Sequence, residues 1–188
     1  MKNQDMRVRV TKEIFHRSLM ELVQQKPIDR ITVKELVEKA RVNRGTFYLH
    51  YQEPRDVLKE IENDFVAENL SVFETEWSVE NNRNVMAKVF AFILENRNIC
   101  RILMGPNGDP QFLISLGNLA KEGVIAEWQH KNPAYGRRDL EDLFDFVFYG
   151  STQLIINWIE DSKGITVEQL AHRLDRLGNA AVAAVGEF

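Results

Sequence analysis

Two helix starts in close succession constrain the fold of this chain more than any other feature of its sequence. Thr32 and Glu35 have the spacing of a capping box, in which the hydroxyl and the carboxylate each bond a free backbone amide of the first helical turn. This helix is expected to end near Ala40, and Asn43, a second N-cap residue, follows after a few residues. The segment therefore predicts two short helices joined by a tight turn, a helix-turn-helix arrangement.

The rest of the chain is also expected to be helical. Apolar residues recur at helical spacing, and no stretch shows sustained strand alternation between turn signals. The predicted fold class is all-α, with an N-terminal three-helix helix-turn-helix domain, a larger helical domain and about nine helices in total. The expected helices cover residues 10–25, 33–40, 43–51, 54–73, 82–95, 97–104, 110–130, 138–161 and 166–184.

Charge is distributed unevenly along the 188 residues. Residues 1–58 hold 12 Lys and Arg against 8 Asp and Glu, a net charge of +4, whereas residues 59–188 hold 12 against 20, a net charge of −8. A polyanionic partner should therefore meet the N-terminal part, although mixed charges also serve solubility alone. We expect two domains, one over residues 1–53 and one over residues 54–188.

The second of the two short helices has side chains suited to DNA. Its N-terminal turn would present side chains to base edges in the major groove, where Arg44 can bond guanine O6 and N7. Gly45 lets the backbone approach the duplex, and Thr46, Tyr48 and His50 supply donors to phosphates. Taken singly, each of these residues is as well explained by packing. Two further residues, Phe47 and Tyr51, lie four apart and should share the buried face.

The run ITVKELVEKARVNRGTFYLHY, residues 31–51, resembles the helix-turn-helix of the TetR family of bacterial transcriptional regulators. The similarity covers approximately residues 8–60, and beyond residue 60 it holds at the level of the plan, a helical ligand-binding and dimerisation domain. The resemblance implies that the protein binds double-stranded DNA through a DNA-binding domain over residues 1–53. It also implies that residues 54–188 form an effector-binding and dimerisation domain. It implies DNA contacts from Thr32, Lys34, Arg44, Gly45, Thr46, Tyr48 and His50, next to the cap residue Asn43.

Two positions depart from the family pattern. The family usually has glycine where this chain has Arg41, and a left-handed arginine there would cost ~1 kcal/mol relative to glycine. The family also favours a phosphate-contacting lysine where this chain has Pro54. Arg55 is the nearest replacement, and it points about 100° further around the helix.

The C-terminal part has two features that predict assembly and sensing. Apolar residues surround most of the expected helix 138–161, and a single partner helix cannot bury all of this surface. This helix and the last one should therefore form a four-helix interface in a homodimer. A sensing pocket would be apolar and enclosed, although each candidate on its own is better explained as a core residue, because aromatic residues at helical spacing commonly fill interiors. The candidate dimer residues are Phe146, Leu154, Trp158, Leu170, Leu174, Leu177 and Ala181, and the candidate pocket residues are Phe90, Leu94, Met104, Phe112, Leu116, Trp128, Phe144 and Phe148.

Three functions remain to be weighed. The leading one is a repressor released from a palindromic operator by a small ligand, and the second is a TetR-like protein that acts through a protein partner with weak or lost DNA binding. An enzyme is disfavoured, because no catalytic or metal-binding motif is found, and no cofactor or metal is expected. Cys100 is the single cysteine, no apolar run is free enough of polar residues to cross a membrane, and the first residues lack a secretory signal, which together predict a cytoplasmic protein.

Overall fold

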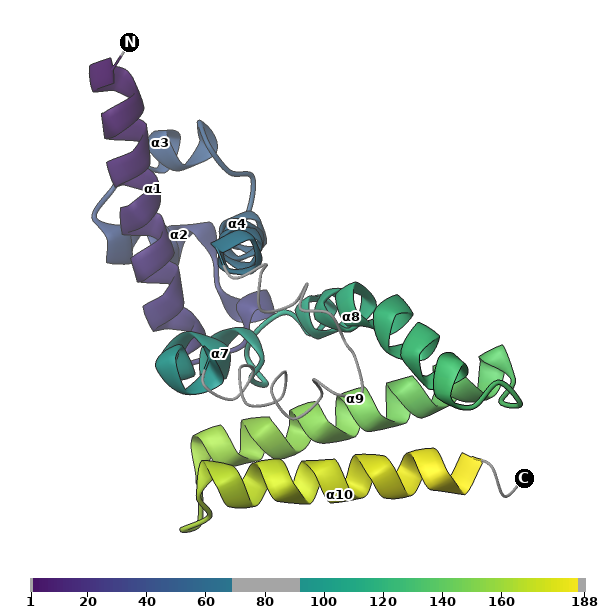
Figure 1. Ribbon diagram of the computed structural model, residues 1–188. Helices are drawn as coiled ribbons and strands as arrows, with labels where there is room; N and C mark the ends of the chain where they lie inside the picture. The colour runs from purple at the N-terminus through teal and green to yellow at the C-terminus, as the bar shows by residue number, and fades with distance from the viewer. Residues whose placement is uncertain (1, 69–91, 186–188) are drawn as a thin grey trace. The chain divides into compact units, whose positions relative to one another are not determined.

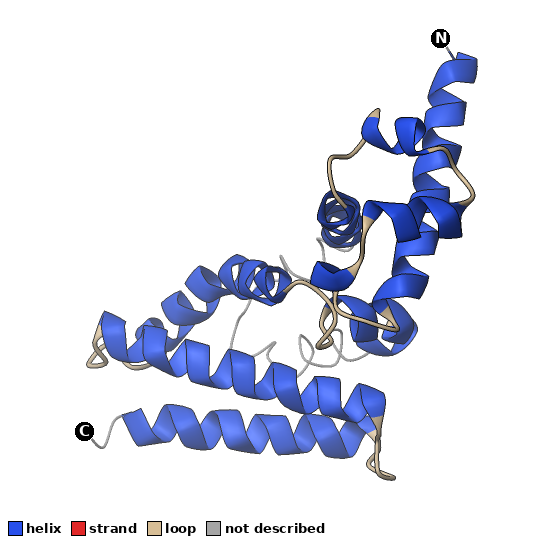
Figure 2. Ribbon diagram, turned by 180° about the vertical axis from the view of Figure 1, so that it is seen from behind, coloured by secondary structure: helices blue, strands red, loops and turns tan. Residues whose placement is uncertain are grey.

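The computed structural model describes residues 2–68 and 92–185, and all regular structure in these two ranges is helical (Figures 1 and 2). The all-α prediction is therefore confirmed. Within the described ranges, no helix has the length and apolar character needed to cross a membrane. The elements are α1 (Lys2–Val23), the 3-10 helix η1 (Ile28–Arg30), α2 (Val33–Ala40), α3 (Arg44–Tyr48), α4 (Pro54–Glu68), α7 (Arg97–Leu103), α8 (Pro110–Lys131), α9 (Arg137–Glu160) and α10 (Val167–Val185).

Two predicted helices differ from the observed ones. Helix α1 begins well before residue 10, at Lys2. Helix α3 ends at Tyr48 rather than at residue 51. There the backbone tightens into a turn, because the amides of His50 and Tyr51 both donate to the carbonyl of Phe47, at 3.0 Å each. The expected helix 82–95 lies mostly outside the described residues.

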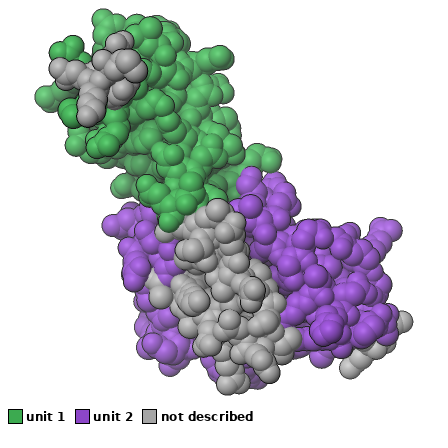
Figure 3. All heavy atoms as spheres, turned by 45° about the horizontal axis from the view of Figure 1, so that its top comes forward, with its two compact units in different colours: residues 1–68, 102–112 green, residues 69–101, 113–188 purple. Residues whose placement is uncertain are grey.

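The chain divides into two compact units, which are coloured separately in Figure 3. Unit 1 contains residues 1–68 together with residues 102–112, and unit 2 contains residues 69–101 and 113–188. Unit 1 thus includes a segment far along the chain, the end of α7 and the turn before α8. The functional division after residue 53 stays a prediction.

The core of unit 1 joins α1 to α2, α3 and α4. Helix α1 packs against α2 and α4. The rings of Phe15 on α1 and Phe47 on α3 meet edge to face with centroids 5.4 Å apart, and both side chains are fully buried. Leu36 of α2 and Leu58 of α4 complete this core, also with no exposed surface. The short helix α3 is therefore held by its apolar face.

In unit 2, α9 and α10 run antiparallel beside each other (Figures 1 and 2). A cluster formed by Ile125 of α8 with Leu140, Leu143 and Phe144 of α9 makes the core between α8 and α9. At the other end of α9, the Nε of Arg97 donates to the carbonyl of Ile159 at 3.1 Å. These contacts bury one side of α9 within the chain.

Candidate nucleic-acid interface

Helix α2 begins with the predicted capping box, which the structure confirms. Oγ1 of Thr32 accepts the amide of Glu35 at 3.2 Å, and the Glu35 carboxylate accepts the amide of Thr32 at 3.0 Å. Lys26 also donates to this carboxylate. The hydrogen bond from Lys26 and those from Thr32 lower the pKa of Glu35 to about 2. The start of α2 is therefore held by the ionised Glu35 carboxylate and its hydrogen bonds to Thr32 and Lys26.

The turn between α2 and α3 contains a left-handed arginine. Arg41 has φ 54° and ψ 38°, and its amide donates to the carbonyl of Glu38 at 3.2 Å. The next amide, of Val42, donates to the carbonyl of Val37 at 3.1 Å. These bonds use carbonyls that the end of α2 would otherwise leave free. Arginine thus occupies the left-handed conformation for which glycine is favoured.

Helix α3 is oriented by its cap and by two buried aromatic residues. Oδ1 of Asn43 accepts the amide of Gly45 at 2.7 Å. Phe47 is fully buried and Tyr51 is 6% exposed, and both rings pack against Phe15 of α1. The predicted buried face of this segment is confirmed. Its other face consequently turns away from the core.

The outward face of α3 carries the predicted DNA-binding side chains. Arg44, Gly45 and Tyr48 are exposed, and Thr46 and His50 are partly exposed. Nη2 of Arg44 donates to the Tyr48 hydroxyl at 2.9 Å, and the guanidinium lies 5.4 Å from the centre of the Tyr48 ring. A cation and an aromatic hydroxyl are thereby held together at the surface.

Helix α2 contributes one clearly available side chain. Lys34 is exposed, and its ammonium lies 3.9 Å from the Glu38 carboxylate in a solvated pair that holds it weakly. The Thr32 hydroxyl is already used, because it accepts the Glu35 amide and donates to the Glu35 carboxylate at 2.8 Å. Thr32 therefore acts in this structure as a helix cap.

Arg55 does not join this exposed face. Its guanidinium donates to two carboxylates of unit 1, those of Asp29 in η1 and Asp109 before α8. The hydrogen bond that Arg55 donates to Asp109, together with the one it donates to Asp29, raises the pKa of Arg55. Pro54 opens α4, as predicted. The sequence alone did not reveal the two carboxylates, which lie 26 and 54 residues from Arg55 along the chain.

Behind α3 lies a polar cluster that the sequence analysis missed. The Tyr51 hydroxyl donates to Glu60 of α4, whose carboxylate also accepts Lys12 Nζ at 2.5 Å and lies 3.2 Å from His16 Nε2. Burial alone would raise the pKa of Glu60, but the hydrogen bonds from Lys12, Tyr51 and His16 outweigh it and lower the pKa to about 2. Burial and the Glu60 carboxylate raise the pKa of Tyr51. The end of α3 is thus tied to both α1 and α4.

The residues predicted to line a sensing pocket are divided between the two units. Phe90 lies outside the described residues. Met104 and Phe112 belong to unit 1, where the Phe112 and Phe65 rings lie 6.4 Å apart. In unit 2, Leu94 is 42% exposed and Leu116 is buried. Three others do come together in unit 2, since Phe144 contacts both Trp128, at 6.5 Å, and Phe148, at 5.4 Å between ring centres.

The predicted dimer residues fall into buried and exposed sets. Trp158, Leu170 and Leu174 are already buried within the single chain. Ala181 packs against the core cluster of α8 and α9. Outward-facing apolar side chains remain, with Phe146 at 72%, Leu177 at 59% and Leu154 at 39% exposure.

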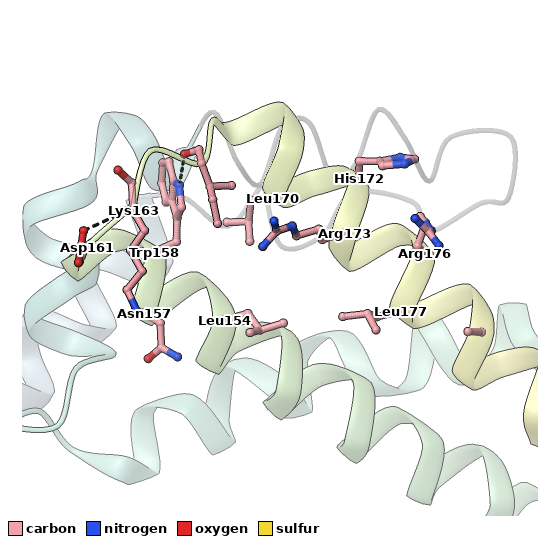
Figure 4. A pocket seen from close by; sticks show the side chains of 13 residues that line it. Leu154, Asn157, Trp158, Asp161, Lys163, Leu170, His172, Arg173, Arg176 and Leu177 are labelled. Atoms are coloured by element: carbon pink, nitrogen blue, oxygen red, sulfur yellow. Dashed lines mark hydrogen bonds between the residues drawn. The ribbon is translucent and has the colours of Figure 1, made fainter.

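A groove of about 590 Å³ lies between the end of α9 and the start of α10 (Figure 4). Leu154, Trp158, Leu170 and Leu177 line its apolar part, and the indole of Trp158 donates to the Ile165 carbonyl at 2.8 Å. Further lining residues are basic, namely Lys163, His172, Arg173 and Arg176. The groove is therefore amphipathic.

A capped pair of short helices, with a buried aromatic face and an exposed face bearing Arg44, Gly45 and Tyr48, defines a helix-turn-helix DNA-binding protein. Residues 17–61 match the family described as bacterial regulatory proteins, tetR family, and residues 80–180 match the transcriptional regulator C-terminal region of that family. The chain belongs to the TetR family of transcriptional regulators. Members of this family are DNA-binding regulators rather than enzymes.

Known proteins share this fold at low sequence identity. A TetR transcriptional regulator from Streptococcus agalactiae 2603V is 21% identical with a TM-score of 0.70, over 94% of this chain and 98% of that one. Thermus thermophilus FadR, a repressor in complex with lauroyl-CoA, is 19% identical with a TM-score of 0.50, over 92% and 93% of the two chains. The HTH-type regulator YxbF of Bacillus subtilis (strain 168) is 20% identical over 164 residues, which are 84% of this chain and 42% of YxbF. This chain therefore spans less than half the length of YxbF.

Proposed function

We propose that the protein reads a DNA operator by inserting α3 into the major groove. The observation that carries this proposal is the exposed face of α3, where Arg44 is held against Tyr48 beside the open backbone of Gly45. Arg44 bonds a guanine, whereas Thr46 and His50 contact phosphates. We leave Arg55 out of this surface because two carboxylates occupy its guanidinium.

The working unit in this proposal is a homodimer. Support comes from the exposed apolar side chains Phe146, Leu154 and Leu177 on α9 and α10, which water would otherwise cover. A two-fold axis through these helices repeats α3 in successive major grooves about 34 Å apart, so the operator is palindromic.

Regulation is proposed to act as repression relieved by a small ligand. A ligand releases the operator if it binds better to a conformation in which the two DNA-reading helices have a different spacing. The loss of DNA affinity can be no larger than the difference between the ligand's affinities for the two conformations. Support for a ligand site comes from three predicted pocket residues of unit 2, since the Phe144 ring contacts both Trp128 and Phe148. A regulator of this kind works in the cytoplasm, where the chromosome lies.

Gel-shift titration against the upstream region of its own gene tests the proposal. Arg44→Ala should weaken specific binding by ~1–3 kcal/mol and relax the preference at one base pair. Thr46→Ala should weaken binding to all sequences alike, because it removes a phosphate contact. Arg138→Ala, which removes an exposed arginine of α9, is the matched control and should bind as the wild type does. Equal, salt-insensitive binding to every duplex would reject the proposal.

A second candidate function is action through a protein partner with little DNA binding. It is favoured by the start of α4, where Pro54 replaces a phosphate-contacting lysine and Arg55 is paired with Asp29 and Asp109. In that case the homodimer stays intact while no duplex is bound specifically. A palindromic operator bound with nanomolar affinity would exclude this alternative.

A further inference from the structure

Leu49 is an exposed apolar residue that the proposed function does not yet explain. Its side chain is 78% exposed, more than any other large hydrophobic residue in the described parts of the chain. It directly follows Tyr48, which is itself 50% exposed. Exposed leucines are common on protein surfaces, so the position of Leu49 on α3 is what distinguishes it.

The backbone places Leu49 on the DNA-facing side of α3. Leu49 closes the helix with φ −73° and ψ −18°, which are helical values, so the helical spacing continues through it. It therefore lies one turn after Gly45 and on the same face. A Cβ added at Gly45 would meet only the Asn43 side chain, at 3.2 Å, so this face is open. A duplex that approaches the backbone at Gly45 would meet the Leu49 side chain next.

The chemistry of the side chain limits what it can recognise. Arg44, Thr46, Tyr48 and His50 all carry hydrogen-bonding groups, whereas Leu49 has none. Of the groups that bases present in the major groove, the C5-methyl group of thymine is the one that apolar side chains contact. We propose that Leu49 contacts a thymine methyl group in each operator half-site and so determines specificity at that base pair.

Replacing thymine by uracil tests this proposal, which depends on the proposed operator binding. Uracil keeps the hydrogen-bonding edge of thymine and lacks only the methyl group. A duplex selected from a random pool by the full-length protein is made with uracil at one thymine position at a time, in both half-sites. Wild-type binding should weaken about fourfold per half-site at one position, the factor that corresponds to burial of one methylene-sized group.

Variants of Leu49 make the test specific. Leu49→Ala should bind the thymine and uracil duplexes with equal affinity at that position, whereas Leu49→Met, which stays apolar and of similar size, should keep the discrimination. Val10→Ala is the matched control, because Val10 is a 48% exposed apolar residue on α1 of the same unit. This control should discriminate as the wild type does. Substitution at such exposed positions is expected to leave the fold stable.

The outcomes separate this inference from the proposed function. If the wild type and Leu49→Ala respond alike to uracil at every thymine position, specific DNA binding stands and the role of Leu49 is rejected. The same conclusion follows if Val10→Ala loses the discrimination together with Leu49→Ala. If no duplex is selected above background, operator binding itself is refuted, and with it the role of Leu49.

Discussion

Replacing Glu62 with glutamine should change how the stability of the protein depends on pH. Glu62 lies on α4 and is 1% exposed, and neither of its carboxylate oxygens has a hydrogen-bond partner among the described residues. A cation lies beside it, since the ammonium of Lys59 is 3.7 Å from Oε2. Burial, with a contribution from the charge of Asp109, raises the pKa of Glu62 from 4.5 to about 7, against the opposing effects of Lys59 and Arg55.

This shift gives the expected magnitude and sign. A folded-state pKa above the unfolded one means that the folded protein holds a proton that the unfolded chain has released. The free energy of unfolding should therefore fall as the pH rises from 4.5 to about 7 and then level off. The loss is about 3 kcal/mol, because one pKa unit corresponds to about 1.4 kcal/mol. Glu62→Gln removes this loss because the amide does not titrate.

Urea unfolding followed by circular dichroism, at pH values between 4 and 8, measures the effect. The stability of Glu62→Gln relative to the wild type should increase with pH by about 3 kcal/mol across this range. Glu68→Gln, an exposed position on the same helix, is the matched control and should show no such trend. A constant difference between Glu62→Gln and the wild type, or one that grows toward acid pH, would refute the reasoning.

Three further substitutions test backbone conformation by calorimetry. Gly108→Ala should destabilise the protein by about 1–3 kcal/mol, since an added Cβ would lie 2.5 Å from the Leu103 carbonyl oxygen. Gly150→Ala on α9, where a Cβ meets nothing within 4 Å, should instead stabilise the protein by about 0.5–1 kcal/mol. If both glycine substitutions changed the stability in the same direction, this explanation would be wrong. Arg41→Gly should stabilise by about 1 kcal/mol, because it relieves a left-handed arginine with φ 54°. An unchanged melting temperature for Arg41→Gly would show that this conformation costs the native protein nothing.

Features that depend on neighbouring residues could be predicted from the sequence. The capping box of Thr32 and Glu35, the Asn43 cap and the start of α4 at Pro54 all involve groups within a few residues of one another. Local geometry decides such bonds, so their spacing is visible in the chain. The buried face of α3 followed for the same reason, because Phe47 and Tyr51 are one turn apart.

Contacts between distant segments could not be predicted in this way. Tyr51 was correctly expected on the buried face, but the partners of its hydroxyl were not foreseen. The hydroxyl meets Glu60 of α4 beside Lys12 and His16 of α1, and only the packing of α1 on α4 brings these groups together. Arg55 was predicted to replace the phosphate-contacting lysine of the family. Its two carboxylate partners are remote in sequence, so the pairing could not be foreseen. The predicted pocket residues were chosen for apolar character, which does not determine the unit into which each one folds.

Because residues 102–112 belong to unit 1, this unit is not one continuous stretch of the chain, which limits how chimaeric proteins can be built from it. The carbonyl of Asn107 accepts the amide of Ile28 at 2.9 Å, and the Asp109 carboxylate accepts a hydrogen bond from the Arg55 guanidinium. This distant segment therefore completes the fold of the N-terminal unit. A chimaera joined at a single crossover near residue 68 would combine the first 68 residues with a foreign version of that segment. Transplanting the complete unit onto another regulator requires two separate exchanges in the gene.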